Sequence, residues 1–106
     1  MQLVTLGSGS SGNGYILQND DEALIIECGM PLKDAAEALG GNLKKVAGCL
    51  ITHSHSDHAG FIRQYARPFN IVATKGTLEE KKIKEDDFHY NFIPMLKEFC
   101  IGNFVI

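Results

Sequence analysis

The run from Val46 to Ile51 is the feature that most narrows what this chain can fold into. It is almost continuously apolar, which is typical of a strand buried on both faces of a sheet. Directly after it, the segment T-H-S-H-S-D-H at residues 52–58 places three histidines and one aspartate within six positions. A buried strand that leads into so many imidazole and carboxylate groups predicts a polar site held at the end of a rigid scaffold.

The other apolar runs predict a sheet interleaved with helices. A helix begins near Pro31, places Leu32, Ala35 and Leu39 on one face, and ends at Gly40-Gly41. A glycine-rich loop occupies residues 7–14. Strands are predicted at 2–6, 15–18, 23–27, 46–51, 71–73 and 88–93 and after the turn at 102–103, and further helices at 61–65 and 77–84. This pattern indicates an α/β or α+β layered fold, a mixed β-sheet with helices on one face.

Length and composition suit one soluble domain, residues 1–106. The formal net charge of −3 does not suggest a polybasic partner surface. There is no signal-peptide pattern, and no apolar stretch approaches the roughly 20 residues that cross a bilayer, so no membrane partner is expected. Three widely spaced cysteines, Cys28, Cys49 and Cys100, favour a reducing, cytoplasmic setting in which they act as small apolar side chains.

The histidine-rich segment has the chemistry of a metal site. Imidazole nitrogen and carboxylate oxygen suit Zn²⁺ best, and they also bind Mn²⁺ or Fe. Ligands this dense on one loop can serve two adjacent ions, which in hydrolases activate a shared water for attack at neutral pH. The alternative is a solvated polar loop whose histidines merely titrate, but that reading does not explain their position directly after a buried strand.

The segment T-H-S-H-S-D-H-A-G at residues 52–60 resembles the H-x-H-x-D-H signature of the metallo-β-lactamase superfamily. The resemblance implies a metal-dependent hydrolase with a dinuclear, metal-activated hydroxide. It also implies that His53 and His55 bind one metal ion while Asp57 and His58 bind the other. Asp57 would in addition act as the catalytic acid/base group.

Two further segments extend the resemblance. L-G-S-G-S-S-G-N at residues 6–13 is similar to the loop of a bacterial and phage branch that includes exonuclease-like enzymes. L-I-I-E-C-G resembles the second strand of the superfamily, with Glu27 where Asp is usual. Glu27 is then either a group that hydrogen-bonds the metal loop or a plain strand-end carboxylate. The loop Gly7–Gly14 either receives a phosphate on its backbone N–H groups or is simply a turn.

The resemblance implies metal ligands that this sequence lacks, namely a third histidine for the first ion, a bridging aspartate and a last histidine. His89 lies in a β-prone run and is more simply a strand histidine. The chain therefore resembles the N-terminal half of an αββα sandwich, which is either truncated in the gene or the sequence or completed by a second chain. Such a half leaves one sheet face for a missing C-terminal half or for self-association to cover.

The leading functional hypothesis is a metal-dependent phosphodiesterase or nuclease-like hydrolase, whose partner is nucleic acid or another phosphodiester. The acidic balance counts against tight nucleic-acid binding by this half alone. Hydrolysis of a thioester, lactone or lactam remains an alternative within enzymes. The alternative outside them is a non-catalytic remnant or interaction module that binds metal weakly, because two ligands per ion fix no geometry.

Overall fold

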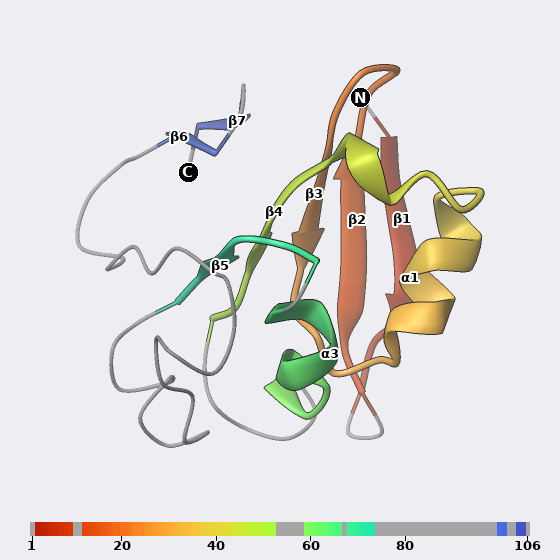
Figure 1. Ribbon diagram of the computed structural model, residues 1–106. Helices are drawn as coiled ribbons and strands as arrows, with labels where there is room; N and C mark the ends of the chain where they lie inside the picture. Colours follow the sequence, from red (N-terminus) through yellow and green to blue (C-terminus); the bar gives the residue numbers. More distant parts are fainter. Residues whose placement is uncertain are drawn as a thin grey trace.

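A five-stranded sheet in the order β1-β2-β3-β4-β5 is the main element of the computed structural model (Figure 1). The structure describes residues 2–9, 12–52, 59–66, 68–73, 100–101 and 104–105. The strands of this sheet are β1 (Gln2–Gly7), β2 (Gly14–Gln18), β3 (Ala23–Ile26), β4 (Val46–Leu50) and β5 (Ile71–Val72). The helical elements are α1 (Leu32–Ala38), the 3₁₀ turn η1 (Leu43–Lys45) and α3 (Ile62–Ala66).

The sheet is mixed, as the sequence predicts. Strands β1, β2 and β3 pair antiparallel, and β3, β4 and β5 pair parallel. The turn between β2 and β3 is closed by Asn19, whose side-chain Oδ1 accepts hydrogen bonds from the backbone N–H groups of Asp21 and Glu22, each at 2.8 Å. Helix α1 lies on the connection from β3 to β4, and α3 on the connection from β4 to β5, as parallel pairing requires.

Helices α1 and α3 cover the same face of the sheet, and the main core lies between them and the strands (Figure 1). Register places one residue of each strand in a row on this side, because residues paired across a sheet share a face. That row is Val4, Ile16, Ile25, Cys49 and Ile71. The helices add Ala35, Ile62, Tyr65 and Ala66. The predicted layer of helices on one face is confirmed for the described residues.

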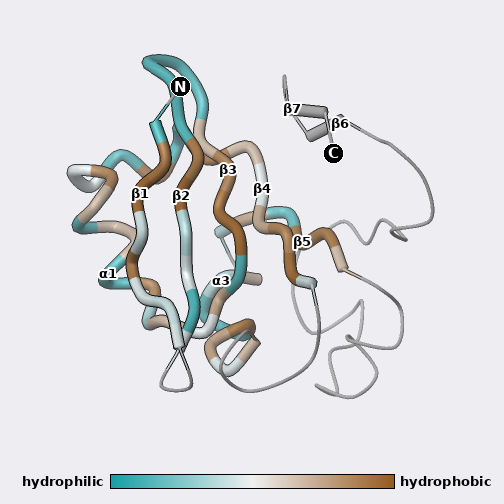
Figure 2. Tube along the Cα trace, turned by 180° about the vertical axis from the view of Figure 1, so that it is seen from behind, coloured by the Kyte–Doolittle hydropathy of each residue, from teal (hydrophilic) through white to brown (hydrophobic). Residues whose placement is uncertain are grey.

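Strands β3 and β5 are apolar along much of their length (Figure 2), and some of their residues lie on the face opposite to the helices. Leu24 and Val72 are buried there, and Leu17, Ile26 and Leu50 pack against them while remaining partly exposed. The sequence predicts a strand at 46–51 that is buried on both faces. In the structure β4 is fully buried only at Gly48 and Cys49, because its neighbours on the second face are incompletely covered.

Several predicted elements fall where expected and others lie outside the described residues. Helix α1 begins one residue later than predicted, with Pro31 as its N-cap, and it ends at Ala38 before Gly40-Gly41. Strands β6 (Cys100–Ile101) and β7 (Phe104–Val105) pair antiparallel, and residues 102–103, where the turn is predicted, lie outside the described residues. The predicted helix at 77–84 and the β-prone run at 88–93, which includes His89, lie outside the described residues.

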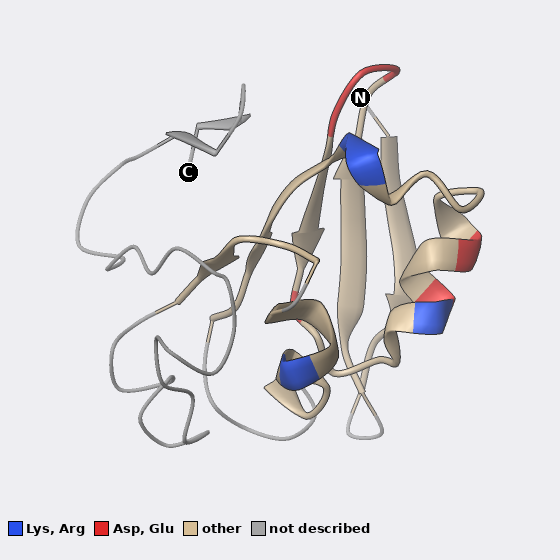
Figure 3. Cartoon of the chain, viewed as in Figure 1, with Lys and Arg blue, Asp and Glu red and all other residues tan. Residues whose placement is uncertain are grey.

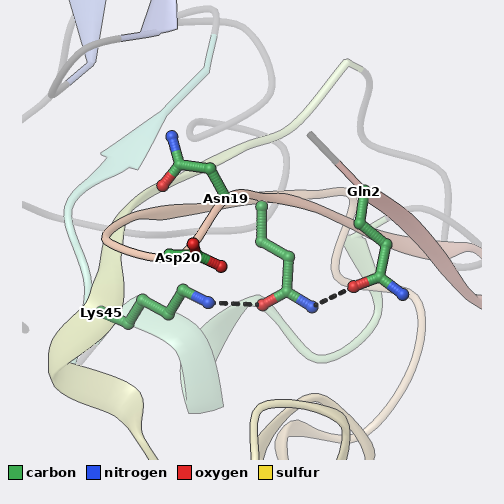
Figure 4. A pocket seen from close by; sticks show the side chains of 5 residues that line it. Gln2, Asn19, Asp20 and Lys45 are labelled. Carbon is green, nitrogen blue, oxygen red and sulfur yellow. Dashed lines mark hydrogen bonds between the residues drawn. The ribbon is translucent and has the colours of Figure 1, made fainter.

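The end of the sheet at which β2 finishes and β4 begins carries a polar pocket of about 220 Å³ (Figure 4). Lys45 Nζ donates a hydrogen bond to Gln18 Oε1 at 2.9 Å, and Gln18 Nε2 donates to Gln2 Oε1 at 3.4 Å. Asn19 and Asp20 complete its lining. The register of the strands places this pocket at the end of the sheet opposite to the one from which residues 53–58 leave.

Candidate functional site

The end of the sheet where β3 and β4 finish also carries the glycine-rich loop and helix α3. Parallel strands end at the same edge, so the segment after β3 and the segment after β4 emerge side by side. The glycine-rich loop between β1 and β2 turns at this edge too, because Gly7 pairs with Gly14 there. Helix α3 closes the group (Figure 1). We call residues 53–58 the histidine loop and residues 27–32 the strand-end segment.

Glu27 is the buried charged residue of this site, at 3 % exposure. Its backbone φ of 69° lies in the left-handed region, which turns the chain sharply out of β3. The backbone N–H of Glu27 donates to the Leu50 carbonyl at 2.8 Å. Its carboxylate Oε1 accepts a hydrogen bond from the backbone N–H of Thr52 at 3.0 Å. Of the two sequence interpretations of Glu27, this bond fits the one in which Glu27 hydrogen-bonds the backbone at the entrance of the histidine loop.

The exit of the histidine loop is attached to the same segment. The backbone N–H of Phe61 donates to the Cys28 carbonyl at 2.9 Å. Glu27 and Cys28 are neighbours, so Thr52 and Phe61, which flank the histidine loop, are hydrogen-bonded to adjacent residues of the strand-end segment.

The four predicted metal ligands, His53, His55, Asp57 and His58, lie outside the described residues. Their coordination geometry therefore stays a prediction. Elsewhere, no group of three or more His, Cys, Asp or Glu side chains suited to a metal ion occurs within the described part of the chain. The donor set of the loop, three imidazoles and one carboxylate, fits Zn²⁺ chemically, and the anchored ends at Thr52 and Phe61 fit a loop that must hold its ligands in place.

The glycine-rich loop is organised by Asn13, which is 7 % exposed. The Asn13 side chain bridges both backbone groups of Gly9, accepting from its N–H at 3.1 Å and donating to its carbonyl at 3.0 Å. The Tyr15 hydroxyl lies 3.4 Å from Asn13 Oδ1. In the sequence this loop is marked by its glycines and serines, and the role of Asn13 is not predicted. An asparagine between two glycines is the available signal, since Asn side chains commonly bond the backbone of turns.

The glycine-rich loop lies directly against the strand-end segment. Gly29 N–H donates to the Asn13 carbonyl at 2.9 Å. A Cβ built on Gly12 would stand 2.5 Å from the Gly29 carbonyl oxygen and 2.9 Å from the Met30 sulfur, and one on Gly7 would stand 2.9 Å from the same sulfur. Glycine is therefore needed at Gly12 because the two backbones approach too closely for any side chain.

Two cysteines lie buried beneath the site on the helix-covered side of the sheet. Cys28 and Cys49 are free thiols with no exposed surface, as expected for small apolar side chains. The hydrogen bond with Cys28, followed by burial, holds the pKa of the Cys49 thiol well above its usual range. Burial, followed by the nearby thiols, likewise raises the pKa of the Tyr65 phenol. Both groups are thus neutral at ordinary pH.

Positive charges in the described residues stand on separate elements (Figure 3). Lys33 lies on α1, Lys45 on η1 beside Lys44, and Arg63 on α3. This distribution gives no concentrated basic surface in the described part of the chain. None of the helices in that part is long and apolar enough to cross a membrane.

Comparison with known proteins identifies the relatives of this chain. The family model "Metallo-beta-lactamase superfamily" matches residues 7–96. The chain is 37 % identical over 75 residues to the exodeoxyribonuclease YycJ of Bacillus anthracis, a match covering 67 % of this chain and 28 % of that protein. It is 33 % identical over 73 residues to the anti-Pycsar protein Apyc1 of Bacillus phage 010DV004, covering 62 % and 28 %.

The fold has close counterparts among solved structures. The metallo-beta-lactamase fold protein YhfI from Bacillus subtilis aligns with a TM-score of 0.72 at 18 % identity, over 97 % of this chain and 49 % of that one. The chain thus spans less than a third of the curated relatives above and about half of this solved structure.

Proposed function

Because this chain belongs to the metallo-beta-lactamase superfamily, we propose that it provides the metal-binding half of a metal-dependent hydrolase acting on phosphodiesters, with nucleic acid as the favoured substrate. The observation that carries the proposal is the double attachment of the histidine loop, at Thr52 to the Glu27 carboxylate and at Phe61 to the Cys28 carbonyl. Anchored flanks of this kind would fix the points at which the loop enters and leaves the site. Metal ligation needs such preorganisation.

We assign the four side chains of the loop as the resemblance implies. His53 and His55 would hold one divalent ion, and Asp57 and His58 the second, with Zn²⁺ favoured over Mn²⁺ or Fe. Two bound ions supply a water of lowered pKa and positive charge near the scissile group. Asp57 would take up or deliver a proton at its carboxylate during the reaction.

Phosphodiester substrates are preferred for two reasons. The exodeoxyribonuclease relative is named for an activity on DNA, and the match to it covers two thirds of this chain. The glycine-rich loop lies against the strand-end segment that anchors the histidine loop, and backbone N–H groups of such loops are suited to phosphate oxygens. Activity is expected of the protein that also contains the remaining ligands, not of these 106 residues alone.

The test measures metal binding and hydrolysis with the full product of the reading frame. Replacing His53 and His55 with Ala together should remove most Zn²⁺ binding in calorimetry and elemental analysis. Asp57→Ala should lower the rate on bis-p-nitrophenyl phosphate and on DNA by about two orders of magnitude, the usual contribution of an acid/base group. Retained metal stoichiometry in the double variant would overturn the ligand assignment.

The substrate is tested separately from the metal site. An enzyme that binds two ions but hydrolyses a thioester, lactone or lactam rather than a phosphodiester would retain the metal site and overturn the substrate class. A protein that binds metal weakly and hydrolyses none of these substrates would support the non-catalytic interaction module instead.

A further inference from the structure

Helix α3 begins directly after the histidine loop and returns two polar side chains to the strand-end segment. The Tyr65 hydroxyl donates a hydrogen bond to the Met30 carbonyl at 2.8 Å and lies 3.4 Å from the Pro31 carbonyl. The Gln64 side-chain Oε1 accepts a hydrogen bond from the Leu32 backbone N–H at 2.8 Å. Helix α3 is therefore hydrogen-bonded to Met30, Pro31 and Leu32 of the strand-end segment.

Neither contact is explained by the filling of the core or by hydrogen bonding within α3 itself. Tyr65 has no exposed surface, so a phenylalanine ring would occupy the same volume without bringing a polar group into the core. Helix α1 has no side-chain cap from its own N-cap residue, Pro31. Gln64, an exposed residue of another helix, supplies the acceptor for the first N–H of α1. Both side chains act between elements.

The strand-end segment links every part of the site that the structure describes. Its first residues attach the entrance and exit of the histidine loop, through Glu27 and Cys28. Gly29 bonds the glycine-rich loop, and the Met30 side chain lies close to Gly7, Gly12 and Gly14 of the same loop. A shift of Met30 would therefore be felt by both loops.

We infer that Tyr65 and Gln64 are positioning residues, which fix the exit of the histidine loop and the glycine-rich loop in one arrangement by clamping Met30 and Leu32 to α3. The inference rests on the proposed function, since it assigns these residues to the geometry of that metal site. They touch neither substrate nor metal ligand in this role. They act through the backbone of the strand-end segment.

The experiment compares Tyr65→Phe, Gln64→Leu and the matched control Gln64→Glu in the full product of the reading frame. Phe keeps the ring and removes the donor, Leu removes the acceptor, and Glu keeps an acceptor oxygen at the same position. Zn²⁺ affinity is measured by calorimetry, and the free energy of unfolding by urea titration. Hydrogen exchange of the Phe61 and Thr52 amides is measured against that of Cys49 in β4.

We expect Tyr65→Phe and Gln64→Leu each to weaken Zn²⁺ binding about tenfold, the lower end of the effect of groups outside the ligand sphere. The Phe61 amide should exchange faster relative to the Cys49 amide, and Gln64→Glu should behave as the parent protein. A merely structural role would lower stability in Tyr65→Phe and Gln64→Leu without changing the affinity of the folded protein or the ratio of the two exchange rates.

Failure of the inference and failure of the proposed function give different results. If the parent binds Zn²⁺ and both Tyr65→Phe and Gln64→Leu bind it equally well, the positioning role is wrong and the proposed function stands. If the parent binds no Zn²⁺, the proposed function fails. In that case an unchanged exchange rate of the Phe61 amide in both variants overturns the positioning role of Tyr65 and Gln64. A faster exchange rate retains that role, as one that holds the two loops in place without a metal ion. Gln64 is exposed, so its variants decide the matter even if Tyr65→Phe does not fold.

Discussion

At the scale of single residues, Glu27 concentrates the unusual features of this chain. A non-glycine residue with φ of 69° is strained by about 1–3 kcal/mol, and a buried carboxylate loses hydration unless it is hydrogen-bonded. The hydrogen bond that the Glu27 carboxylate accepts from the Thr52 N–H, at the entrance of the histidine loop, offsets part of the burial penalty and leaves the backbone strain. Strain that persists at such a position is typical of functional sites.

The first prediction concerns this acceptor. Glu27→Ala should weaken Zn²⁺ binding by about 10- to 100-fold, because an outer hydrogen bond that orients the metal loop is lost. It should also lower the free energy of unfolding by about 1–3 kcal/mol, since the partly buried hydrogen bond from the Thr52 N–H is left unmade. Calorimetry and urea titration measure the two effects. Glu27→Gln is the control, because its amide oxygen can still accept from Thr52, and its loss should be smaller on both counts. Equal losses in the two variants would show that the charge, rather than the acceptor, is what matters.

At the scale of elements, the glycine-rich loop is shaped by its approach to the strand-end segment. Gly9 and Gly12 both have positive φ, at 137° and 151°, yet their surroundings differ. A Cβ on Gly9 would meet nothing within 4 Å, whereas one on Gly12 would stand 2.5 Å from the Gly29 carbonyl oxygen. Substitutions at Gly9 and Gly12 therefore distinguish the energetic cost of a positive φ from the cost of a steric clash.

The second prediction uses this pair. Gly9→Ala should lower the free energy of unfolding by about 1–3 kcal/mol, the usual penalty for a side chain at such φ values. Gly12→Ala should lower it further, because the loop must also move away from Gly29, a backbone group that cannot rotate aside. Urea titration of both variants measures the difference. Equal losses would mean that the loop relaxes freely and does not press on the strand-end segment.

The sequence predicts the elements of this site better than their connections. The strand at 46–51 and the helix from 31 are recognisable because apolar periodicity is local, and they appear as β4 and α1 with bounds shifted by one residue. The attachment of Phe61 to Cys28 is a backbone bond between residues far apart in sequence, and no side-chain pattern encodes it. In the sequence Tyr65 is one more apolar position of a short predicted helix. Nothing in the sequence pattern indicates that its hydroxyl bonds the Met30 carbonyl.

At the scale of the whole molecule, the second face of the sheet is the feature that the described residues leave least covered. Register aligns six apolar residues on it, in two rows across the strands: Leu3, Leu17 and Leu24, then Ile26, Leu50 and Val72. Leu3 is 61 % exposed and lies on β1, an edge strand of the sheet. The chain covers about half of the solved structure of the metallo-beta-lactamase fold protein YhfI. We therefore propose that this face packs against the remaining half of the fold.

The third prediction is that the 106-residue chain, produced alone, self-associates through this face. Apolar rows next to an edge strand favour association between two copies of the chain, because the association buries the apolar side chains and covers the strand edge at the same time. Leu3→Lys should shift sedimentation velocity profiles towards the monomer, since it places a charge on the exposed corner of the face. Gln2→Lys is the matched control. It adds the same charge to the neighbouring position of β1, whose side chain points to the helix-covered side, and it should leave the association unchanged.

A parent chain that sediments as a monomer and melts cooperatively would show that these residues close their own core, and the proposal of a covering half would then be wrong. Equal effects of Leu3→Lys and Gln2→Lys would assign the association to net charge or to the strand edge instead of the apolar face.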